Sequence, residues 1–320
     1  MSNKEYRPTL SQLRTFVTIA ENRHFGTAAA KLGISQPSLS QALSALESGL
    51  CMQLIERSTR KVIVTSTGQD LLPYAKATLD AADAFLARSR GAHGPLHGAL
   101  TIGVIPTVAP YVLPYLLGLM QETYPDLEPR IIEDQTARLV NMLREGTLDV
   151  AIIATPAEAV GISERTLYHE QFVVVVPEDH PLAGRNDLKL DALNDLNLLL
   201  LEDGHCLHDQ IIDLCRKAEI NPTEATTAIT RASSLTTIMQ LVVAGMGATL
   251  APLSAVGPEC HRDGVATARF APGITAERHI GLAFRASTSR EEEFELLGEL
   301  VKKAYAQAVE AFGEEAVLEA

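Results

Sequence analysis

The sequence predicts an α/β protein in three parts: a small helical module, one long helix, and a larger body of strands and helices. Apolar residues recur at helical spacing over residues 9–46, and again over residues 67–90. From residue 99 onward, short runs rich in Leu and β-branched residues alternate with helical patterns. Alternation of strands and helices on this scale favours a parallel sheet, so the body is expected to be α/β.

The charge of the chain is divided unevenly. The 320 residues allow two or three domains with their own cores. A net charge of −13 argues against a DNA-binding surface along the whole chain. Residues 1–68, however, contain eight Lys or Arg against four Asp or Glu, which leaves −17 for the remainder. A basic amino-terminal module on an acidic body is typical of a DNA reader joined to another domain.

The amino terminus begins with no apolar leader, and the sequence contains no stretch of about 18 consecutive apolar residues. We therefore expect a cytoplasmic protein that has no membrane partner. In a reducing compartment the four cysteines, Cys51, Cys206, Cys215 and Cys260, are expected to be free thiols at rest. We expect Cys51 to lie in a core and Cys260 in a loop.

Three short helices are predicted near the amino terminus. The first covers residues 9–21, and the second covers residues 26–32 and stops at Gly33. Ser35 is a good N-cap for the third helix, which places Leu39, Leu43 and Leu46 on its inner face. A helix, a tight turn and a capped, polar-faced helix form the helix-turn-helix pattern, whose second helix enters the major groove of DNA.

The polar face of the third helix provides the candidate DNA contacts. Gln and Ser side chains read base edges, whereas Arg and Lys bind phosphates. The helix contributes Gln36, Pro37, Ser38, Ser40 and Gln41, and its surroundings contribute Arg23, Arg57, Arg60 and Lys61. Residues 57–65 are expected to form a short two-stranded wing. The alternative is a small helical domain whose polar face is merely solvated.

Four short motifs carry a family resemblance. They are Ala-Ala-Ala-Lys-Leu-Gly-Ile-Ser-Gln-Pro-Ser-Leu-Ser at 28–40, Leu-Glu at 46–47, Leu-Ile-Glu-Arg at 54–57 and Thr-Ser-Thr-Gly at 65–68. Residues 8–90 are similar to the amino-terminal part of LysR-type transcriptional regulators. The resemblance implies a winged helix-turn-helix DNA-binding domain at 1–66. One departure is the neutral Gln-Ala-Leu-Ser at 41–44, where such proteins often have basic residues, so phosphate anchoring is expected to rest more on the wing and Arg23.

Residues 67–92 are expected to form a linker helix, with Pro73 in its first turn. Its apolar stripe has no neighbouring partner in the sequence, which favours packing against a second copy of the chain. The alternative is a helix docked on the body. A Gly/Pro-rich hinge at 91–95 then marks the best domain boundary.

The body is expected to contain two subdomains. Strands are predicted at 99–105, 127–132, 148–153, 172–176, 197–201, 248–251 and 280–284, and helices at 110–124, 136–145, 206–218, 235–244 and 291–312. The family resemblance implies a periplasmic-binding-protein-like effector domain with crossings near 167–171 and 268–276. Subdomain I would comprise 93–168 and 272–312, subdomain II would comprise 169–271, and an acidic tail would follow at 313–320. A ligand would bind in the cleft between the subdomains.

Residues 198–215 concentrate the reactive side chains. A Leu run at 198–201 ends at Glu-Asp-Gly, and His205, Cys206 and a helical pattern reaching Cys215 follow. A helix start favours the thiolate form of Cys206, although a buried structural thiol is the usual alternative. On one helix the two cysteines would lie about 13 Å apart along the axis. A disulfide needs Cα atoms within about 7 Å. Either the thiols are unrelated, or their pairing unwinds the helix.

Glu-Asp-Gly-His-Cys-Leu at 202–207, with Cys215 downstream, resembles the peroxide-sensing members of the same family, as does Ile-Pro-Thr-Val-Ala-Pro-Tyr at 105–111. The resemblance implies that hydrogen peroxide oxidises Cys206 to a sulfenic acid and that Cys215 resolves it as a disulfide. It also implies a peroxide site formed by Thr107, Thr136, His205 and Arg278.

The implied function is peroxide-dependent transcription regulation, not enzymatic turnover. The implied partners are promoter DNA, a dimer of dimers, RNA polymerase and a thioredoxin- or glutaredoxin-type reductant. We expect no cofactor, and no zinc site, because Cys206, His208 and Cys215 match no standard zinc spacing; His208 is expected at the surface. The alternatives are a metabolite-responsive regulator with incidental cysteines, and a thiol peroxidase.

Overall fold

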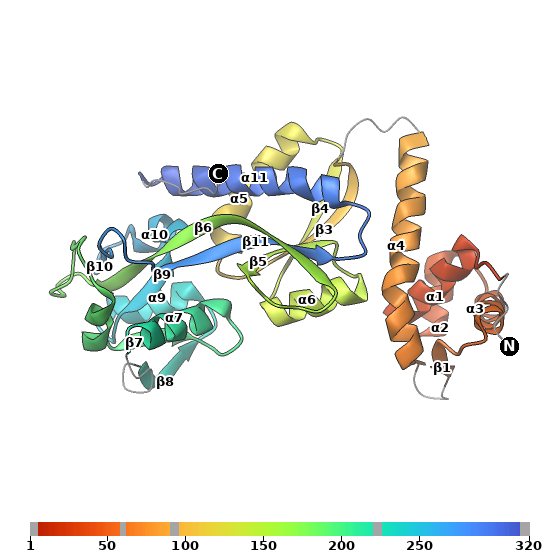
Figure 1. The fold of residues 1–320 in the computed structure, drawn as a ribbon, viewed down its shortest axis with the longest axis horizontal. Coiled ribbons are helices and arrows are strands. Elements are labelled where there is room, and N and C mark those ends of the chain that lie inside the picture. The colour runs from red at the N-terminus through yellow and green to blue at the C-terminus, as the bar shows by residue number, and fades with distance from the viewer. Residues whose placement is uncertain (1–5, 58–61, 90–95, 220–225, 314–320) are drawn as a thin grey trace. The chain divides into compact units, whose positions relative to one another are not determined.

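The computed structural model describes residues 6–57, 62–89, 96–219 and 226–313 (Figure 1). The chain forms two compact units. The first comprises residues 1–94 with 141–149 and 285–291, and the second comprises the rest. The predicted limits of the subdomains remain predictions. The predicted acidic tail lies outside the described residues, apart from Gly313.

Three short helices open the chain: α1 (Leu10–Asn22), α2 (Phe25–Leu32) and α3 (Gln36–Leu50). Each begins at a side chain that accepts a hydrogen bond from a backbone N–H of its first turn. The capping residues are Thr9, His24 and Ser35. Gly33 ends α2 at a φ of 65°, a conformation that costs glycine little. The predicted helix-turn-helix is therefore confirmed.

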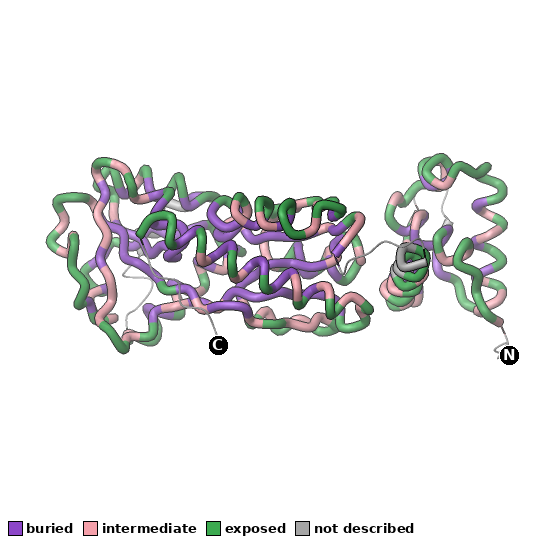
Figure 2. The backbone as a smooth tube through the Cα atoms, turned by 90° about the horizontal axis from the view of Figure 1, so that it is seen from above, coloured by how far each residue is buried: buried purple, intermediate pink, exposed green. Residues whose placement is uncertain are grey.

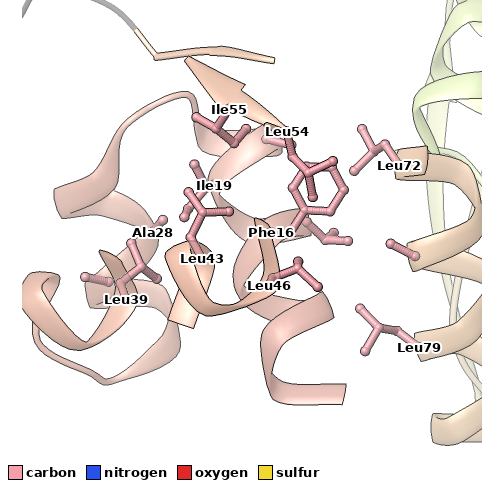
Figure 3. Close-up of a cluster of buried hydrophobic side chains, with 14 residues drawn as sticks. Phe16, Ile19, Ala28, Leu39, Leu43, Leu46, Leu54, Ile55, Leu72 and Leu79 are labelled. Atoms are coloured by element: carbon pink, nitrogen blue, oxygen red, sulfur yellow. The ribbon is translucent and has the colours of Figure 1, made fainter. Parts of the chain in front are cut away.

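The three helices enclose one apolar core (Figure 3). Phe16 and Ile19 from α1 pack with Ala28 from α2 and with the inner face of α3. That inner face is Leu39, Leu43 and Leu46, each with no exposed surface. The spacing of these leucines leaves the opposite face of α3 in solvent.

The predicted wing is present and is tied to α3. Strand β1 (Ile55–Arg57) pairs antiparallel with β2 (Val62–Val64). The carboxylate of Glu47 accepts hydrogen bonds from the backbone N–H groups of Leu54 and Ile55, at 2.8 and 3.0 Å. This contact gives the Leu-Glu motif at 46–47 a physical reason, because it fixes the wing to the carboxyl end of α3.

The long helix α4 runs from Ser66 to Ser89. Thr65 accepts a hydrogen bond from the N–H of Gly68 at 3.0 Å, and a Cβ at Gly68 would lie 2.3 Å from the carbonyl oxygen of Leu54. The Thr-Ser-Thr-Gly motif is thus a helix start packed tightly on the wing. Because the helix begins at Ser66, Pro73 is its eighth residue, and the prediction of a first-turn proline was wrong.

One face of α4 packs against the helix-turn-helix of the same compact unit. Leu72, Ala75 and Leu79 are buried in the helix-turn-helix core. Figure 3 shows Leu72 and Leu79 pointing from α4 toward the three short helices. The prediction that this part of the apolar stripe packs against a second copy was therefore wrong, because α1 already covers it. Tyr74 and Phe85, with 64% and 72% of their surface exposed, remain on other sides of the helix.

The body begins with three parallel strands: β3 (Gly98–Val104), β4 (Leu127–Glu133) and β5 (Val150–Thr155). β3 lies between the other two. Helices α5 (Ala109–Thr123) and α6 (Thr136–Glu145) provide the crossovers. Figure 2 shows the buried residues concentrated along the strands, with exposed outer faces on the helices. The predicted α/β alternation is confirmed here.

Two strands join the halves of the sheet. β6 (Ile162–Pro177) is one continuous strand of 16 residues, although the sequence predicted only its second half, at 172–176. It lies beside β11 (Glu277–Arg285), which pairs antiparallel with β5 (Figure 1). The sheet is therefore mixed, not parallel throughout. Residues 167–171 and 268–276, the predicted crossings, correspond to the middle of β6 and to the segment that leads into β11.

The remaining elements surround the second half of β6. It pairs antiparallel with β9 (Thr249–Pro252) and β10 (Val265–Ala268). A separate parallel pair joins β7 (Leu198–Leu201) to β8 (Thr226–Ala232). The helical elements are η1 (Leu190–Asp195), α7 (Cys206–Lys217), α9 (Leu235–Val243), α10 (Leu253–Cys260) and α11 (Glu291–Glu310). The sequence did not predict η1, β8, α10 or β10. Tyr305 of α11 stacks on Tyr168 of β6 at 3.9 Å between ring centroids.

Among the described ranges, none of the helices combines the length and apolar character that crossing a bilayer requires.

We expect Leu46→Ala to destabilise the helix-turn-helix by about 2–5 kcal/mol, because it leaves a cavity in a fully buried core. Leu10→Ala is the matched control, since Leu10 is 45% exposed, and its effect should stay within about 0.5 kcal/mol. Urea unfolding followed by circular dichroism measures both, and equal effects would contradict the proposed core.

Candidate functional site

Cys206 stands at the turn from a buried strand into a helix. β7 ends at Leu201, and α7 begins at Cys206 with His205 as its N-cap residue. Gly204 between them has a φ of 93°, which side chains larger than hydrogen disfavour. A Cβ at Gly204 would lie 2.8 Å from the side-chain oxygen of Gln135. The loop before Cys206 therefore packs directly against the residue that precedes Thr136.

A continuous chain of polar contacts leads from Cys206 into the sheet. The Cys206 sulfur lies 4.0 Å from the hydroxyl oxygen of Thr107. That hydroxyl oxygen accepts a 2.7 Å hydrogen bond from Arg278, which also donates to the Thr107 carbonyl at 3.0 Å. Arg278 is fully buried and forms an ion pair with Glu170 at 2.7 Å. Residues from β6, from β11 and from the segment after β3 thus meet at one guanidinium group.

Thr136 and His205 have buried polar atoms that lack a partner. The hydroxyl of Thr136 and Nδ1 of His205 form no hydrogen bond to any described residue. Most buried polar groups in native proteins are satisfied, so two such atoms flanking the Gln135–Gly204 contact are unusual. A small polar molecule that both donates and accepts hydrogen bonds would satisfy them.

The thiol of Cys206 is under opposing influences. Burial raises its pKa above the ordinary value, while the positive charge of Arg278, the Thr107 hydroxyl and the N–H of Leu207 lower it. The net direction is upward. The expectation that the helix start favours a thiolate holds for the local contribution, but the loss of solvent outweighs it. When Cys206 ionises, Thr107 can donate its O–H to the sulfur, because its oxygen already accepts from Arg278.

Cys215 lies at the other end of α7. It is fully buried, and the helix is continuous from Cys206 to Lys217. A rise of 1.5 Å per residue separates the two positions by about 13 Å along the axis. All four cysteines are described, and none of them forms a disulfide. The structure therefore shows the state in which the two thiols are apart.

Three expectations about other side chains were wrong. Cys51 is exposed because it follows the last turn of α3 in a left-handed conformation, and so does not reach the core. Cys260 is the last residue of α10, where burial raises its pKa to about 12. His208 is half-buried instead of lying at the surface: 19% of its side chain is exposed, and its Nδ1 lies 2.8 Å from the carbonyl oxygen of Leu201.

Glu170 is the site residue that the sequence analysis missed. Its side chain is fully buried, and it accepts hydrogen bonds from Arg278 and from the backbone N–H of Ser254. The available signal was weak: an acidic residue two positions after Tyr168 and two positions before the apolar run at 172–176. Only the approach of β11 shows why a carboxylate is needed there.

The predicted DNA contacts lie mostly on one exposed surface. Gln36, Pro37, Ser38 and Gln41 are exposed on the first turns of α3, and Ser40 is partly buried. Ser35 caps this helix by accepting from the N–H of Ser38 at 3.2 Å. Arg23 is exposed at the carboxyl end of α1. Arg57 ends β1, but its side chain is outside the described set, and Arg60 and Lys61 lie outside the described residues.

The comparison with protein families agrees with this arrangement. Residues 10–69 match the model described as "Bacterial regulatory helix-turn-helix protein, lysR family", and residues 93–306 match the LysR substrate binding domain. The chain belongs to the LysR family of bacterial transcription regulators, which are DNA-binding proteins and not enzymes.

Within that family, similar relatives include proteins named for hydrogen peroxide and a protein named OxyR. A probable hydrogen peroxide-inducible genes activator of Mycobacterium avium is 48% identical over 308 residues, which cover 94% of this chain and 97% of the relative. The DNA-binding transcriptional dual regulator OxyR of Escherichia coli is 38% identical over 295 residues, covering 92% and 94% of the two chains.

Similar solved structures include OxyR proteins. A Corynebacterium glutamicum OxyR cysteine-to-serine mutant with hydrogen peroxide bound is 64% identical, with a TM-score of 0.69 and coverage of 96% and 95%. A full-length OxyR cysteine-to-aspartate mutant from Pseudomonas aeruginosa has a TM-score of 0.78 at 32% identity, with coverage of 93% and 96%.

We expect the rate of Cys206 oxidation by hydrogen peroxide to rise about tenfold per pH unit from pH 6 to pH 8, because a raised pKa leaves only a small thiolate fraction there. Stopped-flow mixing with quantification of the oxidised peptide measures this rate. A flat profile would mean that the thiol is already ionised at pH 6.

We expect Glu170→Gln to slow Cys206 oxidation roughly tenfold or more, because Arg278 loses the charge that orients it against Thr107. Glu295→Gln removes an exposed ion pair with Arg165 and serves as the control. Circular dichroism verifies folding. Equal rates in a folded Glu170→Gln variant and the wild type would contradict the positioning role.

Proposed function

We propose that this chain is a transcription regulator that senses hydrogen peroxide through Cys206. The observation that carries the proposal is the contact chain from the Cys206 sulfur through Thr107 to the buried guanidinium of Arg278. The relatives named as peroxide-inducible activators, and an OxyR structure with hydrogen peroxide bound, support it.

The proposed reaction begins with the Cys206 thiolate. The sulfur attacks one oxygen of hydrogen peroxide, the O–O bond breaks, and the sulfur loses two electrons to become a sulfenic acid. The other oxygen leaves as hydroxide and takes up a proton to form water. Negative charge develops on that leaving oxygen, so hydrogen-bond donors stabilise the transition state. Thr107, Thr136, His205 and Arg278 are the proposed donors.

We propose that Cys215 completes the switch. Its thiolate attacks the sulfenic sulfur of Cys206, a disulfide forms, and hydroxide leaves and is protonated to water. The intact α7 holds the two residues too far apart for this bond, so the helix must unwind. Leu207, Ile211 and Leu214 are buried on α7 and would lose their packing. A large change at the surface of the body follows from a small chemical step.

The remaining partners follow from the same proposal. The exposed Tyr74 and Phe85 of α4 support pairing with a second copy of the chain. We propose a dimer of dimers on promoter DNA, with RNA polymerase as a further contact and a thioredoxin- or glutaredoxin-type reductant that restores the thiols. A regulator of bacterial genes works where the DNA is, so we place the chain in the cytoplasm.

A metabolite-responsive regulator with incidental cysteines is the remaining alternative. The unpartnered polar atoms of Thr136 and His205 would also suit a small metabolite. Such a regulator would bind its ligand tightly without any dependence on the thiols, whereas a peroxide sensor needs Cys206. A thiol peroxidase is disfavoured, since it would leave the DNA-binding module without a role.

We expect Cys206→Ser to abolish the peroxide-dependent change in DNase footprint, while Cys51→Ser, which removes an exposed thiol, retains it. Serine does not form the sulfenic acid, so the first step is lost. A peroxide response that persists in Cys206→Ser would refute the proposed function. In Cys215→Ser, mass spectrometry should detect oxidised Cys206 but no disulfide peptide.

A further inference from the structure

Three metal-ligating side chains converge on the strands β6 and β11. His169 comes from β6, and Glu277 and His279 come from β11. One ligand atom of each residue lies within 4.8 Å of the other two. We propose that these three residues form a binding site for a divalent transition-metal cation such as Zn²⁺, which departs from the expectation that the chain holds no metal.

The cluster occupies the face of the two strands opposite the thiol site. Side chains alternate between the two faces of a strand, so His169 points away from its neighbour Glu170, and Glu277 and His279 point away from Arg278. Burial agrees: Glu170 and Arg278 are fully buried, whereas His169 and Glu277 retain 30% and 27% of their side-chain exposure. A cation therefore reaches the cluster from solvent without passing the thiol site.

The three side chains are already held together without a cation. Nδ1 of His169 lies 3.5 Å from a carboxylate oxygen of Glu277, and the rings of His169 and His279 stack at 4.1 Å between centroids. Both strands are paired in the sheet, so the backbone that carries the ligands is rigid. Zinc–nitrogen and zinc–oxygen bonds of about 2.0–2.2 Å require the ligand atoms to close in by roughly 1 Å. Imidazole binds a metal through a lone pair in the plane of its ring, so the two rings must also rotate out of their nearly parallel stack for both to reach one cation.

The ligand types select the class of cation. Two imidazoles and one carboxylate suit Zn²⁺, Ni²⁺, Co²⁺ or Cu²⁺, whereas Mg²⁺ and Ca²⁺ prefer all-oxygen sites. Three protein ligands leave at least one position for water, and partial exposure favours exchange with solvent. Occupancy would then follow the available metal concentration. The bound cation would tie β6 to β11 directly behind the Glu170–Arg278 ion pair.

The test uses Co²⁺ as a spectroscopic probe on the full-length, reduced protein. We expect one equivalent of Co²⁺ to bind and to give weak d–d absorption without the strong charge-transfer band of thiolate ligation. His169→Gln and His279→Gln should each weaken this binding at least tenfold. His180→Gln is the matched control, because it removes a partly buried imidazole that is not part of the cluster.

A second readout separates the site from non-specific binding. Zn²⁺ at a hundredfold excess over its Kd should raise the melting temperature of the wild type by several degrees, and that of His279→Gln by clearly less. Circular dichroism verifies that the variants fold. The proposal is overturned if Co²⁺ fails to bind, if the His169→Gln and His279→Gln variants bind as tightly as the wild type, or if charge-transfer absorption identifies cysteines as the ligands.

Discussion

The body of this protein depends on one buried cation, the guanidinium of Arg278. It has no exposed surface, and it is held by the carboxylate of Glu170 and by two oxygens of Thr107. A guanidinium group without a partner at such a depth would destabilise the fold by several kcal/mol, so its contacts with Glu170 and Thr107 must be maintained. The ion pair therefore joins β6, β11 and the segment after β3 at one point. The sulfur of Cys206 lies next to that point, at 4.0 Å from Thr107.

The same arrangement explains why a raised thiol pKa is compatible with a sensor. Loss of solvent raises the pKa of the Cys206 thiol, while Arg278 and Thr107 lie where they can stabilise negative charge on the sulfur. While the two thiols are apart, α7 is a continuous helix with a buried apolar face. In the proposed switch, the S–S bond can form only if α7 unwinds and loses its packing. On the reverse face of β6 and β11, the proposed metal site acts on the same two strands.

Local signals predicted the amino-terminal module well. Three of its features depend only on neighbours a few residues away: the N-cap Ser35, the helix stop Gly33 and the leucine stripe of α3. Both partners of each such contact lie close together in the sequence and can be recognised there. The Cys206 segment was predictable for the same reason, as a strand, a Gly turn and a helix. Glu170 was not, because its role depends on an arginine 108 residues later. Likewise, the faces of α4 could not be assigned before α1 was seen to cover Leu72, Ala75 and Leu79.

The sequence by itself determined the family, the α/β class, the position of Cys206 at a helix start and the helix that separates it from Cys215, since caps, periodicity and motifs are local. Only the tertiary structure decided the balance of influences on the Cys206 thiol, the continuous path of β6 through both halves of the sheet, and the grouping of His169 with Glu277 and His279. Burial and contacts between distant segments set these properties, and neither is defined until the chain has folded.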